Sequence, residues 1–123
     1  MENNSKTDIA GAFRNRTKKF VVDNIKFFRT LPKTEEAKII GRQLLRSSSV
    51  GANYRAACRA RSKAEFYSKL SIVVEEADES MFWMEIMIEA EIVKASELNY
   101  LSDEASQILK IVSASRKTAS SNK

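Results

Sequence analysis

Residues 62–89 read SKAEFYSKLSIVVEEADESMFWMEIMIE and carry the strongest structural signal in the chain. Ser62 and Glu65 form a capping box, in which each side chain can accept a hydrogen bond from the other residue's backbone N–H at the start of a helix. Beyond this cap, apolar residues recur at steps of three and four over about 30 residues, which predicts one long helix with a core-facing stripe. The stripe consists of Phe66, Leu70, Val73, Ala77, Met81, Met84 and Ile88.

Outside this stretch the chain has few breaks, because its 123 residues include only 3 Gly and 1 Pro. Pro32 disfavours helical geometry in the residue before it, and Thr34, which two glutamates follow, can cap a new helix. Ser102, which two acidic residues also follow, predicts the start of the last helix. We therefore expect an all-α chain with helices over residues 9–30 and 35–58, the long helix from residue 63, and a fourth from residue 102.

Amphipathic helices with short connections predict an antiparallel up-down-up-down four-helix bundle. We expect the bundle over residues 9–115, with disordered tails at residues 1–8 and 116–123. In the second helix, residues 47–49 are all serine and Gly51 follows. These small residues either leave room for aromatic side chains of the first helix, or weaken the second helix and kink it.

The composition argues against catalysis. The chain has no His and a single Cys, so it cannot form a His-based catalytic group, a His or Cys metal cluster or an intrachain disulfide. Its glycines are isolated, so it has no glycine-rich phosphate loop. Cys58 falls on the apolar stripe of the second helix, which favours a core thiol over a reactive one. We expect no enzyme activity, no metal and no cofactor.

Charge is distributed unevenly along the chain. Residues 1–63 contain 15 Lys and Arg against 5 Asp and Glu, which gives +10, and residues 64–123 contain 6 against 11, which gives −5. A basic half is typical of proteins that bind nucleic acid or another anionic surface. The same pattern also results if the basic half pairs with the acidic half, within a subunit or between subunits.

The second helix shows both alternatives. Lys38, Arg42 and Arg46 follow one another at steps of four, which places them in one stripe on the solvent side. Either this stripe contacts phosphate, or Arg42 and Arg46 pair with Glu75 and Glu79 of a neighbouring subunit. In both cases other cations outnumber the acids nearby, so a basic surplus remains for an anionic partner. The candidate nucleic-acid-binding residues are Lys19, Lys26, Lys38, Arg42, Arg46, Arg55, Arg59 and Arg61.

The long third helix has more apolar surface than one bundle core can cover. At roughly 100° per residue, several large apolar residues fall opposite the core-facing stripe. A bundle of this size has no second layer to cover them, which predicts self-association through that face. Alternatively, long flanking side chains cover Phe82 and Trp83 within the monomer. The candidate interface residues are Ile72, Glu75, Glu79, Phe82, Trp83 and Ile86, with the two glutamates as ion-pair partners.

Several segments resemble a known family when their order and spacing are taken together. They are LPKTEE at residues 31–36, RQLLRSSSVGAN at residues 42–53, SKAEF at residues 62–66, and EEADE at residues 75–79 followed by Trp83. In this order they resemble the bacterial four-helix-bundle family known from open reading frames within the intervening sequences of large-subunit ribosomal RNA genes.

The resemblance covers about residues 13–115 and implies more about fold than about function. It implies a left-handed up-down bundle, a ring of five subunits, and a role similar to that of the accessory protein of diversity-generating retroelements, which works with a reverse transcriptase and its RNA. It implies no catalytic residues. Many members carry an acid two or three residues after the asparagine that matches Asn53, where this chain has Tyr54-Arg55-Ala56. This departure makes the turn region more basic and removes any salt bridge built on that acid.

Together, the residues and the resemblance predict a non-enzymatic homo-oligomer that binds structured RNA or DNA through its basic surface. No apolar run reaches membrane-spanning length and the N-terminal residues lack the apolar segment of a signal peptide, so we expect a cytoplasmic protein with no membrane partner. Phosphate contacts would make binding salt-sensitive and weakly sequence-specific. The alternative is a structural scaffold that uses its basic residues in salt bridges between subunits and whose partner is another protein.

Overall fold

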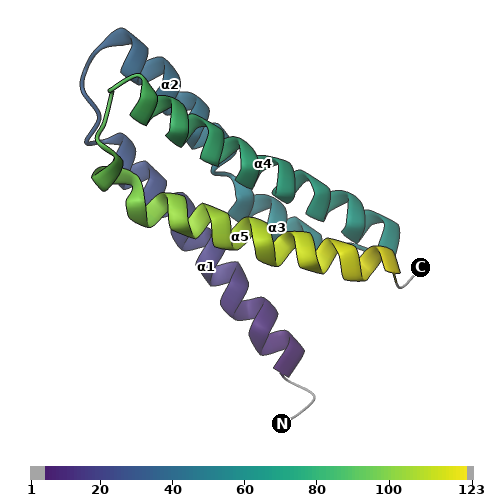
Figure 1. Ribbon diagram of the computed structural model, residues 1–123. Helices are drawn as coiled ribbons and strands as arrows, with labels where there is room; N and C mark the ends of the chain where they lie inside the picture. Colours follow the sequence, from purple (N-terminus) through teal and green to yellow (C-terminus); the bar gives the residue numbers. More distant parts are fainter. Residues whose placement is uncertain (1–4, 122–123) are drawn as a thin grey trace.

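The computed structural model describes residues 5–121, which form helices joined by short connections (Figure 1). No strand occurs among these residues. α2 and α3 follow one another as two parts of one arm, so the chain forms the predicted antiparallel four-helix bundle. The helices are α1 (Ser5–Phe28), α2 (Glu35–Ser47), α3 (Val50–Cys58), α4 (Lys63–Glu89) and α5 (Ala95–Ser121).

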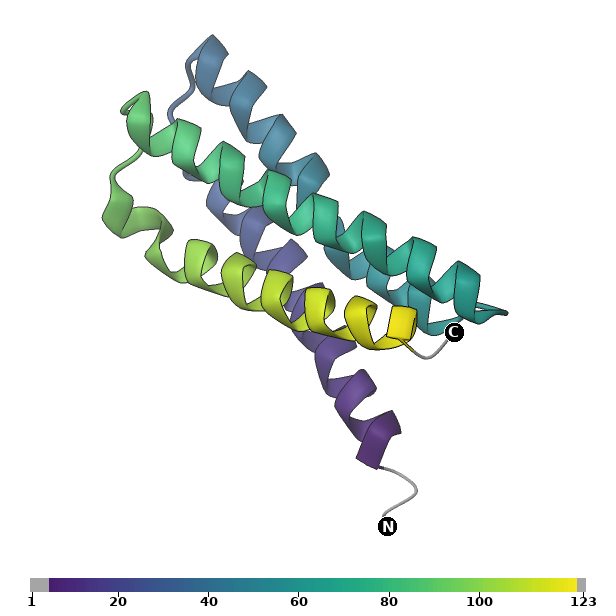
Figure 2. The same ribbon diagram turned by 45° about the vertical axis from the view of Figure 1, so that its right-hand side comes forward.

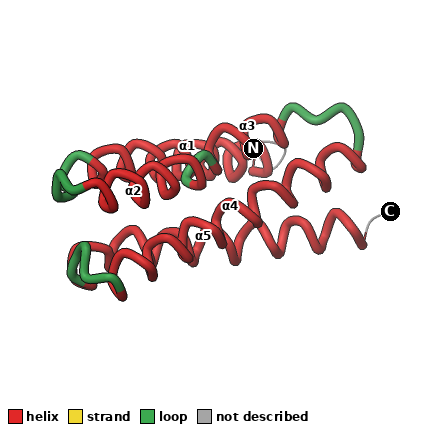
Figure 3. Tube along the Cα trace, turned by 90° about the horizontal axis from the view of Figure 1, so that it is seen from above, coloured by secondary structure: helices red, strands yellow, loops and turns green. Residues whose placement is uncertain are grey.

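The bundle has two layers, which Figure 3 shows from above. α1 lies with α2 and α3 in one layer, and α4 lies with α5 in the other. The first turns of α1 extend beyond the other helices, as Figures 1 and 2 show from two directions. Along the rest of its length α1 contacts both α3 and α5, and these two contacts have different chemistry.

The core follows the stripe predicted for the long helix. Leu70, Val73, Ala77 and Met84 of α4 are fully buried. The other three residues of the stripe are half-buried and pack against the core. Burial of these side chains removes apolar surface from water, which is the main term that stabilises a bundle of this size.

The second arm is not one continuous helix. The prediction of a helix over residues 35–58 is wrong, and the alternative, a kink at the serines, is correct, because α2 ends at Ser47 and α3 begins at Val50. The hydroxyls of Ser47 and Ser48 each donate to the carbonyl oxygen three residues earlier, at 3.1 and 2.8 Å. Such local hydrogen bonds compete with the helical ladder, and three consecutive serines make the competition effective.

The small residues of this arm also leave room for α1. A Cβ added to Gly41 would lie 2.8 Å from Cε1 of Phe28, so an aromatic ring of α1 fills the space at that point. A Cβ added to Gly51 would lie 3.0 Å from the carbonyl oxygen of Thr17, so there the backbone of α1 makes the close approach. Gly51 therefore sets the distance between α1 and α3.

The last helix begins earlier than predicted. α5 starts at Ala95, and the predicted start at Ser102 is wrong because that residue lies inside the helix. The chain turns at Glu91, whose φ of 59° is left-handed. The backbone N–H of Lys94 then donates to Oε2 of Glu97 at 2.7 Å, which is one half of a capping box. This contact, rather than a serine followed by acids, caps the start of α5.

Both outer helices extend further than predicted. α1 already begins at Ser5 and α5 continues to Ser121, so much of each predicted tail is helical. Neither helical extension contains a Gly or Pro that would end the helix. The rest of the predicted tails, residues 1–4 and 122–123, lies outside the described residues.

Candidate nucleic-acid interface

Four cations of α1 divide between two sides of the helix. On the α5 side, the Arg16 guanidinium donates two hydrogen bonds, of 2.7 and 2.8 Å, to the two carboxylate oxygens of Glu104. Lys19 Nζ lies 2.6 Å from Oδ2 of Asp23 and 3.0 Å from the hydroxyl of Tyr100. We call these five residues the paired seam, because each cation in it meets an acid.

Neighbouring acids hold both cations of the paired seam in their charged form. The hydrogen bond with Glu104 raises the pKa of the Arg16 guanidinium, and the hydrogen bond with Asp23 raises the pKa of the Lys19 ammonium. These charges are balanced within the chain. Lys19, a predicted nucleic-acid contact, thus serves to tie α1 to α5.

Another side of α1 borders a groove of about 790 Å³ between α1 and α3. We call it the α1–α3 groove. Two cations of α1 line it, together with one cation of α3 and the residue that follows the end of α3, and the members of each pair are four residues apart. Small and apolar residues also line it. The four cations are Arg14, Lys18, Arg55 and Arg59. The small and apolar residues are Val21, Val22, Gly51 and Ala52.

No acid whose side chain the structure describes balances the charge of the α1–α3 groove. None of its lining residues is acidic, and none of its four cations forms an ion pair with any residue that the structure describes. The sequence explains this, because residues 37–64 contain no Asp or Glu. Lys18, Arg55 and Arg59 are exposed, and Arg14 is half-buried. The groove therefore concentrates positive potential at the surface.

Aromatic packing beneath the groove holds its two walls together. The ring of Phe13 on α1 meets the ring of Tyr54 on α3 edge to face, with 4.7 Å between the centroids. Burial, followed by the interaction with Cys58, raises the pKa of the Tyr54 hydroxyl to about 12. Cys58 itself is exposed in the groove, so the prediction of a core thiol is wrong. The break before α3 shifts the helical register, and Ala57 is buried instead.

The predicted nucleic-acid contacts fall into three groups. Arg55 and Arg59 lie together in the α1–α3 groove. Lys19 and Arg46 form ion pairs with acids of the same chain. The others are exposed and lie outside the residues that line the groove. These others are Lys26, Lys38, Arg42 and Arg61.

Sequence reasoning did not select Arg14 and Lys18, although a signal for them exists. They are four residues apart on α1, so they share one side of the helix, and they lie away from Arg16 and Lys19 at roughly 100° per residue. The acid-free stretch over residues 37–64 marks the neighbour that cannot neutralise them. Combining the two observations separates the free pair from the neutralised pair.

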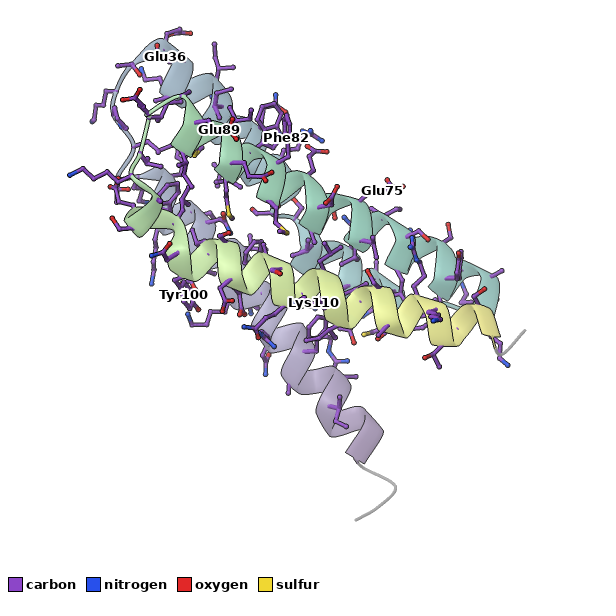
Figure 4. All side chains as sticks on the ribbon, in the orientation of Figure 1. Glu36, Glu75, Phe82, Glu89, Tyr100 and Lys110 are labelled. Carbon is purple, nitrogen blue, oxygen red and sulfur yellow. The ribbon has the colours of Figure 1, made fainter. Side chains whose placement is uncertain are left out.

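The outer side of α4 is a second candidate surface. Ile72 and Phe82 are 39% and 49% exposed, large values for apolar side chains. Glu75 lies between them and is also exposed, and Ile86 is half-buried. Figure 4 shows Phe82 and Glu75 on the side of α4 that points away from α5. We call these four residues the α4 outer face.

Trp83, which was predicted to lie exposed in the interface, is less exposed than expected. It is half-buried and packs against the core, and its ring lies edge to face with that of Phe82, with 5.0 Å between centroids. Its Nε1 donates to Oε2 of Glu79 at 3.3 Å. The alternative of coverage within the monomer thus holds in part for Trp83 and not for Phe82.

The structure also pairs one cation of α2 with an acid of α4. Arg46 forms an ion pair with Glu79 of the same chain and donates to Oε1 of Gln43 at 3.2 Å. One of the two sequence hypotheses placed this pair between subunits, whereas here it lies within one chain. Arg42 and Glu75 are exposed, and neither forms an ion pair with a described residue.

Neither a metal site nor a membrane span is found among residues 5–121. In that range no group of three or more His, Cys, Asp or Glu side chains is placed to hold a metal ion. No helix there is both long and apolar enough to cross a membrane.

The fold and the charged groove define a small helical-bundle protein with a basic groove on its surface. Residues 12–114 match a family described as "23S rRNA-intervening sequence protein", so the chain belongs to this family. The structure of this chain is similar to a crystal structure from Bacteroides thetaiotaomicron, that of a protein of unknown function from the S23 ribosomal protein family. The identity is 28%, the TM-score is 0.79, and the match covers 85% of this chain and 97% of the other. No curated protein gives a significant match.

Proposed function

We propose that this protein binds structured RNA or DNA through phosphate contacts and that the α1–α3 groove is the centre of the binding surface. One observation carries the proposal: the groove brings together four cations with no acid among its lining residues. A polyanion that lies there releases the counterions of its phosphates, which makes binding favourable and salt-dependent. The family description associates its members with intervening sequences of 23S rRNA, which makes RNA the first ligand to test.

We also propose that the protein is a non-enzymatic, cytoplasmic homo-oligomer. The α4 outer face supports self-association, because Ile72 and Phe82 are exposed on one side of the helix and Phe82 lies one turn from the half-buried Ile86. Large apolar side chains exposed along one face of a helix can mark a surface that another protein covers. The ring of five subunits follows from the family resemblance rather than from the geometry of one chain.

A second candidate, a scaffold whose partner is another protein, has one observation in its favour. Arg42 of α2 and Glu75 of α4 are exposed charges of opposite sign on neighbouring helices. In a scaffold, Arg42 of one subunit would pair with Glu75 in the α4 outer face of another. In that case the oligomer, rather than nucleic-acid binding, would depend on these charges.

Fluorescence anisotropy with a labelled RNA hairpin and a labelled DNA duplex tests the proposal, at salt concentrations from about 50 to about 200 mM. We expect binding that weakens steeply with salt. Arg55→Gln with Arg59→Gln should weaken it, whereas the matched change of Lys94→Gln with Lys110→Gln should have little effect, because both of those lysines are exposed outside the groove. Absence of binding at the lowest salt would sink the proposal and favour the scaffold.

Light scattering tests the oligomer separately. Phe82→Ser and Ile72→Ser remove exposed apolar area without removing a buried core residue, so they should lower the native mass if the α4 outer face is the interface. An unchanged mass rejects this interface. If Arg42→Glu lowers the mass and leaves RNA binding unchanged, the scaffold gains support.

A further inference from the structure

We infer that the α1–α3 groove holds one unpaired strand of nucleic acid, laid along the groove with its phosphates between two rows of cations. The inference rests on the proposed function and specifies its ligand. The sugar-phosphate chain would lie between Arg14 and Lys18 on one side and Arg55 and Arg59 on the other.

The two rows have a spacing that suits a strand. On α1 the two cations are four residues apart, which is about 6 Å along the helix axis and close to the distance between neighbouring phosphates of an extended chain. Arg55 and Arg59 have the same separation in sequence, with Arg59 just past the end of α3. The rows come from different helices that Gly51 and Thr17 bring into close contact. A single backbone in the groove can therefore meet cations on both of its sides.

A duplex fits the same place less well. Packed helices have axes about 8–10 Å apart, so the space between their exposed side chains is narrow. The major groove alone of B-DNA is about 12 Å wide, and a whole duplex is wider than the groove it would have to enter. A duplex would rest on the rims and contact one row at a time, which leaves some of the four cations without phosphate.

The rest of the lining indicates what kind of contact the strand makes. Val21, Val22, Gly51 and Ala52 offer a small, apolar surface that can accept sugar carbons and the faces of small bases. None of the lining residues is aromatic, so the groove lacks the stacking platform that many single-strand-binding proteins use. Affinity should then come mainly from charge, and base preference should be weak.

Charge-driven binding gives a quantitative expectation. For a single strand the logarithm of the binding constant falls with the logarithm of salt with a slope of about −0.7 per neutralised phosphate, so four contacts give about −2.8. Each groove cation changed to Gln should make the slope shallower by about 0.7. A 12-nucleotide oligouridylate is a suitable probe, because it forms no stable duplex with itself, and a fully paired RNA of equal phosphate number is its control.

Cys58 supplies a second, independent readout. It is the only cysteine in the chain, it is exposed, and it lines the groove together with Arg55 and Arg59. A strand in the groove should shield the thiol from a neutral alkylating reagent such as iodoacetamide. We expect saturating oligouridylate to slow alkylation of Cys58 at least about fivefold, by simple occlusion of the groove.

Two variants make the test specific. The triple change Lys18→Gln, Arg55→Gln and Arg59→Gln should abolish protection of Cys58 at the same oligonucleotide concentration. It should also make the salt dependence of binding shallower, with a slope of about −0.7 in place of about −2.8. The matched control changes three exposed cations outside the groove, namely Lys33→Gln, Lys94→Gln and Lys110→Gln, and should retain protection. Circular dichroism confirms that both variants keep their helices.

The outcomes separate this inference from the proposed function. Tighter binding of the paired RNA, with Cys58 left unprotected, overturns the single-strand inference and leaves nucleic-acid binding in place. Absence of binding to every nucleic acid overturns both. If phosphatidylserine vesicles protect Cys58 and oligouridylate does not, the groove serves an anionic membrane surface, and the inference is wrong.

Discussion

The paired seam and the α1–α3 groove lie on two sides of the same helix, and their cations differ in pairing. Those of the seam have acidic partners, and those of the groove form no ion pair with a described residue. At the paired seam, acids of α5 and α1 meet Arg16 and Lys19 at hydrogen-bonding distance. At the groove, Arg14 and Lys18 face a segment that contains no acid. A count of cations on α1 therefore does not locate a binding surface; the acids within reach of each cation, on α1 itself or on the neighbouring helix, do.

The strongest test of this comparison reverses charge on the groove side. Arg55→Glu with Arg59→Glu should lower the affinity for a 12-nucleotide oligouridylate about 100-fold at about 100 mM salt, because phosphate contacts are lost and repulsion is added. The free energy of unfolding should change by less than about 0.5 kcal/mol, since both side chains are exposed. Anisotropy measures the first quantity and urea titration the second.

The matched control for this reversal is Lys94→Glu with Lys110→Glu, which makes an equal change in net charge outside the groove. It should weaken binding only through the long-range field, by less than about tenfold. Equal losses for the two double variants would show that net charge matters and that the groove does not.

A smaller effect is expected when the distance between α1 and α3 is changed. Gly51→Ala places a Cβ 3.0 Å from the carbonyl oxygen of Thr17, a backbone atom that can move only with its helix. We expect the variant to lose about 1–2 kcal/mol of unfolding free energy through overpacking, despite the better helix propensity of Ala. Urea titration measures the loss.

Gly11→Ala is the natural control, because an added Cβ there meets only the end of the Arg14 side chain, at 3.5 Å. Its expected result is a gain of up to about 1 kcal/mol, from helix propensity alone. The close approach of α1 and α3 is falsified if the two glycine variants shift stability in the same direction.

Most of the fold was predictable from the sequence. The periodicity of α4, the capping box at Ser62 and the break at Pro32 are local signals. They can be interpreted without knowing which helices pack together. The start of α5 was missed because Ser102 mimics a cap, while the actual cap, Glu97 on the N–H of Lys94, follows no Ser, Thr, Asp or Asn.

The candidate site was only half predictable, for a physical reason. Arg55 and Arg59 stand out because no acid lies near them in sequence. Arg14 and Lys18 have no acid four residues on, whereas Lys19 has Asp23 there. Tertiary packing still decides which side of α1 faces α5. Coverage of Trp83 and the pairing of Arg46 with Glu79 are likewise tertiary facts that no local pattern encodes.

Mutations in the paired seam should have a still smaller effect, and they should change stability rather than nucleic-acid binding. A double-mutant cycle of Arg16→Ala and Glu104→Ala should yield a coupling energy of about 0.5–1 kcal/mol, because a two-point guanidinium–carboxylate pair is among the stronger surface pairs but stays partly in water. Oligouridylate affinity should stay within about twofold of the unmodified protein. A large loss of binding in Arg16→Ala would contradict the division of α1 into two sides.

The smallest expected effect concerns the side of α3 that faces α4, where an amide replaces a cation as the partner of a carboxylate. Nδ2 of Asn53 donates to Oε1 of Glu76 at 2.7 Å. Burial raises the pKa of Glu76, and the nearby Glu79 adds to the rise, while the hydrogen bond from Asn53 opposes it. The folded state therefore holds the Glu76 proton more tightly than the unfolded chain does. Since stability falls with pH wherever the folded state binds more protons, this group costs stability as the pH rises from the ordinary glutamate pKa through the raised one.

Glu76→Gln keeps the acceptor for Asn53 and removes the charge. At about pH 7 the variant should be more stable than the unmodified protein, by less than about 1 kcal/mol for a half-exposed group. At about pH 4 the two proteins should be nearly equal in stability. Urea titrations at the two pH values measure the difference, and a variant that is less stable at about pH 7 would show that Glu76 gains more from the positive groove side of α3 than it loses by burial.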